Sequence, residues 1–129
     1  MIIDASALVA LVRVEPEADR FFRALSETGE PKRMSAANWL EAAVVDGSKS
    51  PIASRRFDEA VAEAGIVIEP VTLEQADIAR AAYRDFGRGS GHPAQLNYGD
   101  CFAYALAKSM REPLLFKGDD FSHTDVAIA

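Results

Sequence analysis

The chain has one cysteine, two histidines and no long uncharged apolar run. A single cysteine excludes an internal disulfide framework, which is typical of a reducing compartment. No apolar run approaches the ~18 residues of a membrane span, and no basic segment precedes the first apolar residues as in a secretory signal. We therefore expect a cytoplasmic protein without a membrane anchor.

Basic residues are in deficit, since 14 Lys and Arg stand against 20 Asp and Glu and give a net charge of −6. Proteins that coat nucleic acids are usually basic, so any role on a nucleic acid must depend on a local site. Hydrophobic residues make up 49% and charged residues 26% of the 129 positions, which is ordinary for a globular protein. The length predicts one domain over residues 1–129.

Strand-like and helix-like segments alternate along the chain. The predicted strands are Met1–Asp4, Lys32–Ala36, Ile66–Ile68, Pro113–Phe116 and, more weakly, Asp125–Ile128. The predicted helices are Ala5–Val12, Glu15–Thr28, Asn38–Asp46, Pro51–Ala64, a long helix that begins after Thr72, and Asn97–Met110. Strands separated by helices predict a mostly parallel sheet covered on both faces.

Acidic side chains stand at four places where the apolar pattern does not call for a charge. Asp4 follows the first strand, Glu41 interrupts an apolar run, Asp100 begins the most apolar helix, and Asp119-Asp120 follow the strand at 114–116. In a parallel sheet, the carboxyl ends of the strands and the starts of the next helices share one edge. We therefore expect these carboxylates to converge there.

Clustered carboxylates without a cation are costly because they repel one another and lose hydration. A divalent ion removes this cost, and hard oxygen ligands favour Mg²⁺ or Mn²⁺, while no Cys/His set with zinc spacing exists. Such a site is suited to phosphodiester hydrolysis by water, with Glu41 as an outer base. Ser6 can hold Asp4 or a metal-bound water by hydrogen bonding, or act only as a helix-start hydroxyl. Lys117 can contact a phosphate, but a solvated lysine at the strand end is the favoured interpretation.

Each acid also has a purely structural interpretation. Asp4 can cap the helix that follows it, and both Asn97-x-x-Asp100 and Asn38-x-x-Glu41 have the spacing of capping pairs. Asp119-Asp120 can be a turn. A purely structural account requires all of these interpretations to be true at once, for acids that meet at one edge of the sheet. A shared function explains this coincidence more simply, so we favour the functional interpretation.

Four segments resemble the PIN-domain nucleases. They are Ile3-Asp4-Ala5-Ser6-Ala7-Leu8-Val9, the run Ala37–Glu41, the run Leu96–Ala107 around Asp100, and Leu114–Phe121. The resemblance covers nearly the whole chain. The length of the chain is also similar to that of the VapC toxins of bacterial toxin–antitoxin pairs. It implies a three-layer α/β/α sandwich with a sheet of four to five strands, and a Mg²⁺-dependent endoribonuclease. It also implies a homodimer and a VapB-like antitoxin that blocks the site.

On the family's pattern, Asp4 and Asp100 are the main metal ligands, and Glu41 with a fourth acid supports them. Many relatives have Thr-x-Asp before the closing Phe, whereas here Phe116 stands at the Thr position and Gly118 three residues before Phe121. The fourth acid must then be Asp119 or Asp120, and we expect Asp119 because it is nearer to the strand.

Two other functions compete with the nuclease. A phosphotransferase or phosphatase would use Asp4 as a nucleophile, but Ser6 stands where such enzymes often place a second aspartate. A non-catalytic binding module would keep the fold and need none of the acids. The RNA target does not follow from the sequence.

Overall fold

The computed structural model describes residues 1–129 and contains one four-stranded sheet in the order β3-β2-β1-β4, with every neighbouring pair parallel. The strands are β1 (Ile2–Ile3), β2 (Lys32–Ser35), β3 (Ile66–Glu69) and β4 (Leu114–Leu115). The helices are α1 (Ala5–Val12), α2 (Ala18–Glu27), α3 (Ala36–Ala42), α4 (Pro51–Ala64), α5 (Leu73–Phe86) and α6 (Tyr98–Met110). A π-helical turn (Ala43–Gly47) extends α3, and a 3-10 turn (Asp120–His123) follows β4.

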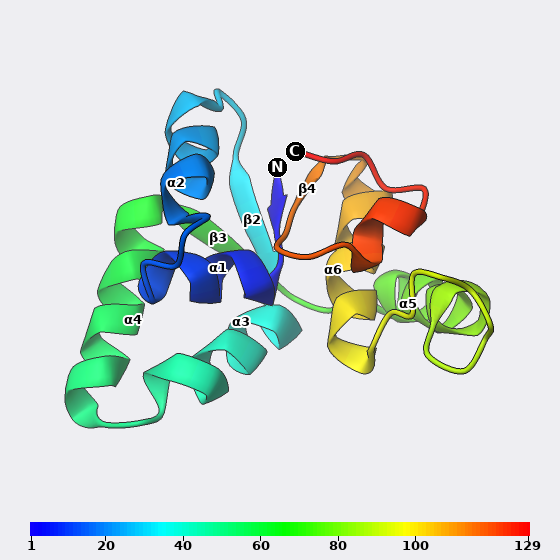
Figure 1. Cartoon of the computed structure of the whole chain (residues 1–129), viewed down its shortest axis with the longest axis horizontal. Helices are drawn as coiled ribbons and strands as arrows, with labels where there is room; N and C mark the ends of the chain where they lie inside the picture. Colours follow the sequence, from blue (N-terminus) through cyan, green and yellow to red (C-terminus); the bar gives the residue numbers. More distant parts are fainter.

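The sheet separates two apolar cores, with α1, α2 and α4 on one face and α5 and α6 on the other (Figure 1). Side chains alternate between these cores along β1 and β4, as the pleat requires. In β1, Ile2 packs toward α6 and Ile3 toward α1, and in β4 Leu114 and Leu115 alternate in the same way. This arrangement confirms the predicted three-layer α/β/α class.

Three sequence predictions need correction. The segment Asp125–Ile128 forms no strand, and only a single bridge joins Ile128 to Leu114. Helix α3 begins at Ala36, because the Ser35 hydroxyl accepts a hydrogen bond from the Ala37 N–H at 3.3 Å. Glu41 therefore lies near the end of α3 and not near its start. The second helix begins at Ala18, after Pro16.

The parallel strands all end at one edge of the sheet, where α1, α3 and α6 begin or end. Asp4 follows β1 directly, and the chain after β4 runs past the same edge through Lys117. Within the structure, no helix is both long enough and apolar enough to cross a bilayer.

Candidate functional site

A cavity of about 280 Å³ opens at this edge, and four carboxylates from distant segments line it. They are Asp4, Glu41, Asp100 and Asp120, and we call this space the acid cavity. Asp119, the acid expected from the sequence, does not line the cavity and is exposed. Asp120, the other candidate, is the acid that the structure brings to the other three.

The turn after β4 explains the choice between these two neighbours. Gly118 has φ +98°, a left-handed conformation that favours glycine, and the 3-10 turn begins two residues later. Phe121 anchors this turn, because its ring is buried and lies 5.0 Å from that of Phe116. Asp120 directly precedes this anchor and lines the cavity, whereas Asp119 is not among the lining residues.

Asp4 is almost completely buried, with only 4% of its surface exposed. Its Oδ2 accepts hydrogen bonds from the Ser6 N–H at 2.9 Å and the Ser6 hydroxyl at 2.6 Å, so Asp4 does cap α1. The Ser6 hydroxyl also accepts a hydrogen bond from the Lys117 N–H at 3.0 Å, which ties the loop after β4 to Asp4. Ser6 thus holds Asp4 in place, and Oδ1 of Asp4 takes no part in the cap.

Asp100 also has a structural role. Its Oδ2 accepts from the Asn97 N–H at 2.7 Å, and the Asn97 side chain accepts from the Asp100 N–H at 2.9 Å, which completes a capping box. The structural interpretations of Asp4 and Asp100 are therefore correct, and they are compatible with a functional one. In both residues the cap uses Oδ2 alone, so each carboxylate keeps an oxygen for a ligand in the cavity.

The carboxylates act on one another electrostatically. Burial raises the pKa of Asp4, and the charge of Asp120 adds to this effect. Desolvation and the charge of Asp4 raise the pKa of Glu41. Burial, together with the charges of Asp4, Asp120 and Glu41, raises the pKa of Asp100 to about 7. The cavity therefore opposes the accumulation of negative charge, as like charges in a desolvated space must.

The cavity contains little positive charge to offset these acids. Lys117 is its one basic lining residue, and its ammonium forms salt bridges with Glu15 at 2.6 Å and Glu17 at 3.2 Å. These partners raise the pKa of Lys117. The predicted contact of Lys117 with a phosphate would compete with both glutamates.

The chemistry of this donor set fits a hard divalent cation, since carboxylate oxygens are the ligands that Mg²⁺ and Mn²⁺ prefer. The side chains do not form a closed cluster, because no three Asp, Glu, His or Cys residues stand close enough to hold a metal ion as they lie. The oxygens of Asp4 and Asp100 that take no part in the caps are the candidates for the first ligands. The resemblance of the sequence to the PIN-domain nucleases likewise implies a divalent metal.

Asn38 is a site residue that the sequence did not single out. It is fully buried, and its Nδ2 donates to Glu41 Oε2 at 3.3 Å and to the Gly99 carbonyl at 3.0 Å. Its Oδ1 is buried without a partner. The predicted capping pair Asn38-x-x-Glu41 is thus wrong, because Ser35 caps α3 and Asn38 joins α3 to α6. A polar residue one turn before Glu41, in an otherwise apolar run, was the available signal.

Gly99 lets Glu41 approach α6. A Cβ at residue 99 would lie 2.5 Å from Glu41 Oε2 and 2.9 Å from Glu41 Cδ, which no ordinary contact allows. The Gly99→Ala substitution is therefore expected to displace the Glu41 carboxylate and lower RNA cleavage about ten- to hundredfold. The melting temperature should change little, because the displaced atoms end a flexible side chain. Cleavage rates and thermal melts of the purified variant measure both effects.

Gly29→Ala is the matched control, because a Cβ at residue 29 meets nothing within 4 Å. Full cleavage by the Gly99→Ala variant would show that the position of Glu41 does not matter.

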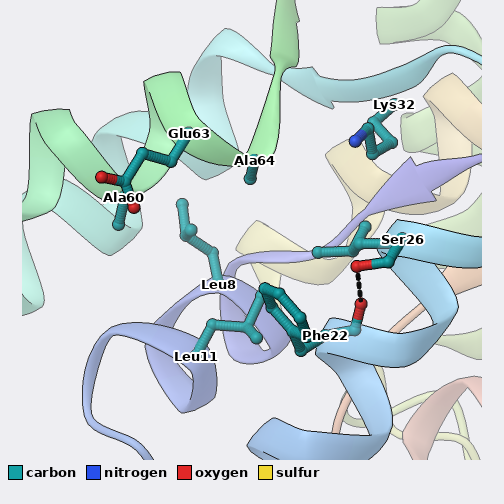
Figure 2. A pocket seen from close by; sticks show the side chains of 9 residues that line it. Leu8, Leu11, Phe22, Ser26, Lys32, Ala60, Glu63 and Ala64 are labelled. Carbon is teal, nitrogen blue, oxygen red and sulfur yellow. Dashed lines mark hydrogen bonds between the residues drawn. The ribbon is translucent and has the colours of Figure 1, made fainter.

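A second, slightly larger cavity of about 310 Å³ lies between α1, α2 and α4 (Figure 2). Its lining is mostly apolar, with Leu8, Leu11 and the exposed ring of Phe22, and its charged groups are Lys32 and Glu63. Two charges of opposite sign form no ligand cluster. The acid cavity is therefore the better candidate for chemistry.

Comparison with known proteins agrees with this geometry. The family model described as "PIN domain" matches residues 1–127. Ribonuclease VapC28 of Mycobacterium tuberculosis is 54% identical over 127 residues, which cover 98% of this chain and 95% of that protein. Ribonuclease VapC42 of the same organism is 50% identical, with 98% and 96% covered. A toxin–antitoxin complex from Klebsiella pneumoniae has a similar fold, with a TM-score of 0.75 at 20% identity over 99% of this chain and 95% of that one. The chain therefore belongs to the PIN-domain family, in the group of the VapC ribonucleases.

Proposed function

We propose that this protein is a Mg²⁺-dependent endoribonuclease, with Mn²⁺ as an alternative ion, and that it is the toxin of a toxin–antitoxin pair. The observation that carries the proposal is the acid cavity, where Asp4, Glu41, Asp100 and Asp120 meet from four segments of one domain. The pKa values of Asp4, Glu41 and Asp100, raised by burial and further by mutual repulsion, indicate a site that gains stability when a cation binds.

The proposed roles follow from the contacts of each side chain. Asp4 and Asp100 would hold the ion through the oxygens that their caps leave free, and Glu41 and Asp120 would support this pair. Ser6 and Asn97 fix the two capped carboxylates, and Asn38 fixes Glu41. When bound, the ion would supply water activation and charge stabilisation at the phosphoryl oxygens. Glu41, whose pKa is raised, would accept a proton from the attacking water.

The choice between the two aspartates after β4 gives a sharp comparison. Asp120→Asn is expected to lower the cleavage rate about ten- to hundredfold, because it removes a carboxylate that lines the cavity. Asp119→Asn should stay within about twofold of the wild type, since ligand shells are local. Initial cleavage rates of both variants at saturating Mg²⁺ measure the difference. A larger loss of cleavage in Asp119→Asn than in Asp120→Asn would instead identify Asp119 as the fourth acid of the site.

A cleavage assay tests the proposed function itself. Purified protein is incubated with a panel of structured RNAs in Mg²⁺, in Mn²⁺ and in excess chelator, and the products are resolved by length. We expect discrete internal cuts that depend on the ion and stop on chelation. Cleavage that persists in chelator would overturn the metal role, and an inert protein on every RNA would overturn the endoribonuclease.

The phosphotransferase alternative is less consistent with the site. Ser6, which stands where such enzymes often place a second aspartate as a general acid, is instead hydrogen-bonded to Asp4 Oδ2. A non-catalytic module has no need for four repelling carboxylates. Trapping with beryllium fluoride should therefore give no adduct at Asp4.

We also propose a VapB-like antitoxin and a homodimer, both in the cytoplasm where the RNA is. A related fold solved as a toxin–antitoxin complex supports the antitoxin. The net charge of −6 and the acid cavity favour a basic antitoxin segment, whose affinity should fall with salt.

Leu40 and Val44, which are 57% and 61% exposed on one side of α3 and its extension, support the dimer. Salt-independent binding, or a monomer in sedimentation, would count against these partners.

A further inference from the structure

Beside the acid cavity, α5 and α6 form a separate hollow of about 340 Å³, which we call the aromatic cavity. Three aromatic side chains and one arginine dominate its lining: Tyr83, Tyr98, Phe102 and Arg80. The remaining lining is Ala76, Ala79 and Cys101. No acidic side chain lines the cavity, in contrast to the neighbouring one.

The aromatic rings at this cavity are open to solvent. Tyr98 is 76% exposed and Tyr83 is 45% exposed, although both lie on helices that pack against each other. The Tyr98 ring meets Phe102 edge to face at 5.0 Å and 86°, so Phe102 supports it and leaves its other surface free. A supported ring with a free face is suited to stacking by a flat ligand.

Arg80 brings a positive charge that no acid neutralises. It forms no salt bridge, whereas Arg84, one turn further along α5, is paired with Asp85 at 2.7 Å. In a protein with a net charge of −6, an unpaired guanidinium at an aromatic surface favours an anionic ligand.

The two cavities share one wall, the first turn of α6. Asn97 and Asp100 line the acid cavity, and Tyr98 and Cys101, which alternate with them in sequence, line the aromatic cavity. A polymer bound at the acids can therefore extend along the first turn of α6 toward the aromatic cavity.

We propose that the aromatic cavity binds an unpaired base of the RNA, adjacent to the phosphate held at the acid cavity. The base stacks on the free face of Tyr98, and Arg80 contacts the phosphate of the same nucleotide. This inference rests on the proposed ribonuclease function and adds a subsite to it. Single-stranded RNA is commonly recognised by stacking on aromatic rings next to positive charge.

The test measures binding to two fluorescein-labelled probes of equal length and charge, an adenylate octamer and an octamer of abasic ribose phosphates. The full chain carries Asp4→Asn so that the probes stay intact. This chain should bind the adenylate octamer about five- to hundredfold more tightly. Adding Tyr98→Ala should remove the preference, and Tyr98→Phe should keep it.

Two matched controls separate the cavity from general surface effects. Phe22→Ala removes an aromatic side chain that is 66% exposed on α2, away from both cavities, and should leave the preference intact. Arg80→Ala should weaken binding of both octamers equally and lower the salt slope by about 1, whereas Arg84→Ala should change neither.

Equal binding of the two octamers, or a preference that survives Tyr98→Ala, would overturn the subsite. A change in sedimentation on Tyr98→Ala with the preference retained would instead make this surface a contact between two copies of the chain, which also overturns it. Cleavage of structured RNA by the wild type in Mg²⁺ is measured separately. Its failure would reject the ribonuclease proposal and not the base-binding result.

Discussion

Replacing Asp4 or Asp100 with asparagine is expected to lower RNA cleavage by at least about a hundredfold. Each substitution removes the charge that would hold the ion and keeps the shape of the side chain. The fold should survive, because asparagine is also a good N-cap and can accept the hydrogen bonds that Ser6 and Asn97 donate. Initial cleavage rates and circular dichroism of the purified variants measure the two effects.

The control for these variants is Asp58→Asn. This substitution removes an exposed carboxylate on α4 that is not among the residues lining the acid cavity. It should cleave RNA at the wild-type rate. Wild-type cleavage by both the Asp4 and the Asp100 variants would reject the metal role of the cavity.

The second large effect concerns stability in the absence of metal. The folded state holds the pKa of Asp100 at about 7, above its ordinary value of 3.8. Between these two values the folded chain binds more protons than the unfolded chain, so this residue's contribution to stability falls as the pH rises from about 4 to 7. Asp4 and Glu41, whose pKa values are also raised, act in the same direction.

We therefore expect Asp100→Asn to be more stable than the wild type at pH 8 in chelator, by roughly 1–2 kcal/mol after allowance for solvent screening. The difference should shrink toward pH 4, where Asp100 is neutral in both states. Urea unfolding at a series of pH values measures it. Acids whose pKa values are lowered, such as Asp46 and Asp125, contribute equally to the stability of the wild type and of the variant. Their contributions therefore cancel in the difference between the two proteins. A difference that does not depend on pH would contradict the electrostatic account.

Local sequence signals were sufficient for the parts of the site that lie at clear element boundaries. The apolar run Met1–Ile3 ends at Asp4, and Asn97 marks the start of α6, so both main acids could be placed at one edge of a parallel sheet. The capping roles of the two acids were likewise visible in the spacing, because caps depend only on residues two or three positions apart.

The features that the sequence could not place depend on backbone geometry or on contacts between distant segments. Asp119 and Asp120 differ by one position, and the turn at Gly118 decides which of them faces the cavity. Asn38 owes its role to Gly99, which is 61 positions away in the sequence. The final segment lacks the ladder of a strand because only Ile128 pairs with β4.

The central claim is that the acid cavity binds a divalent cation, and a Mn²⁺ titration followed by electron paramagnetic resonance tests it most directly. The signal of free Mn²⁺ is measured for the wild type, Asp4→Asn, Asp100→Asn and Asp119→Asn, and then again with competing Mg²⁺. We predict saturable binding to the wild type and to Asp119→Asn, displacement by Mg²⁺, and at least about tenfold weaker binding to the other two variants. Equal Mn²⁺ binding by all four proteins would contradict the claim.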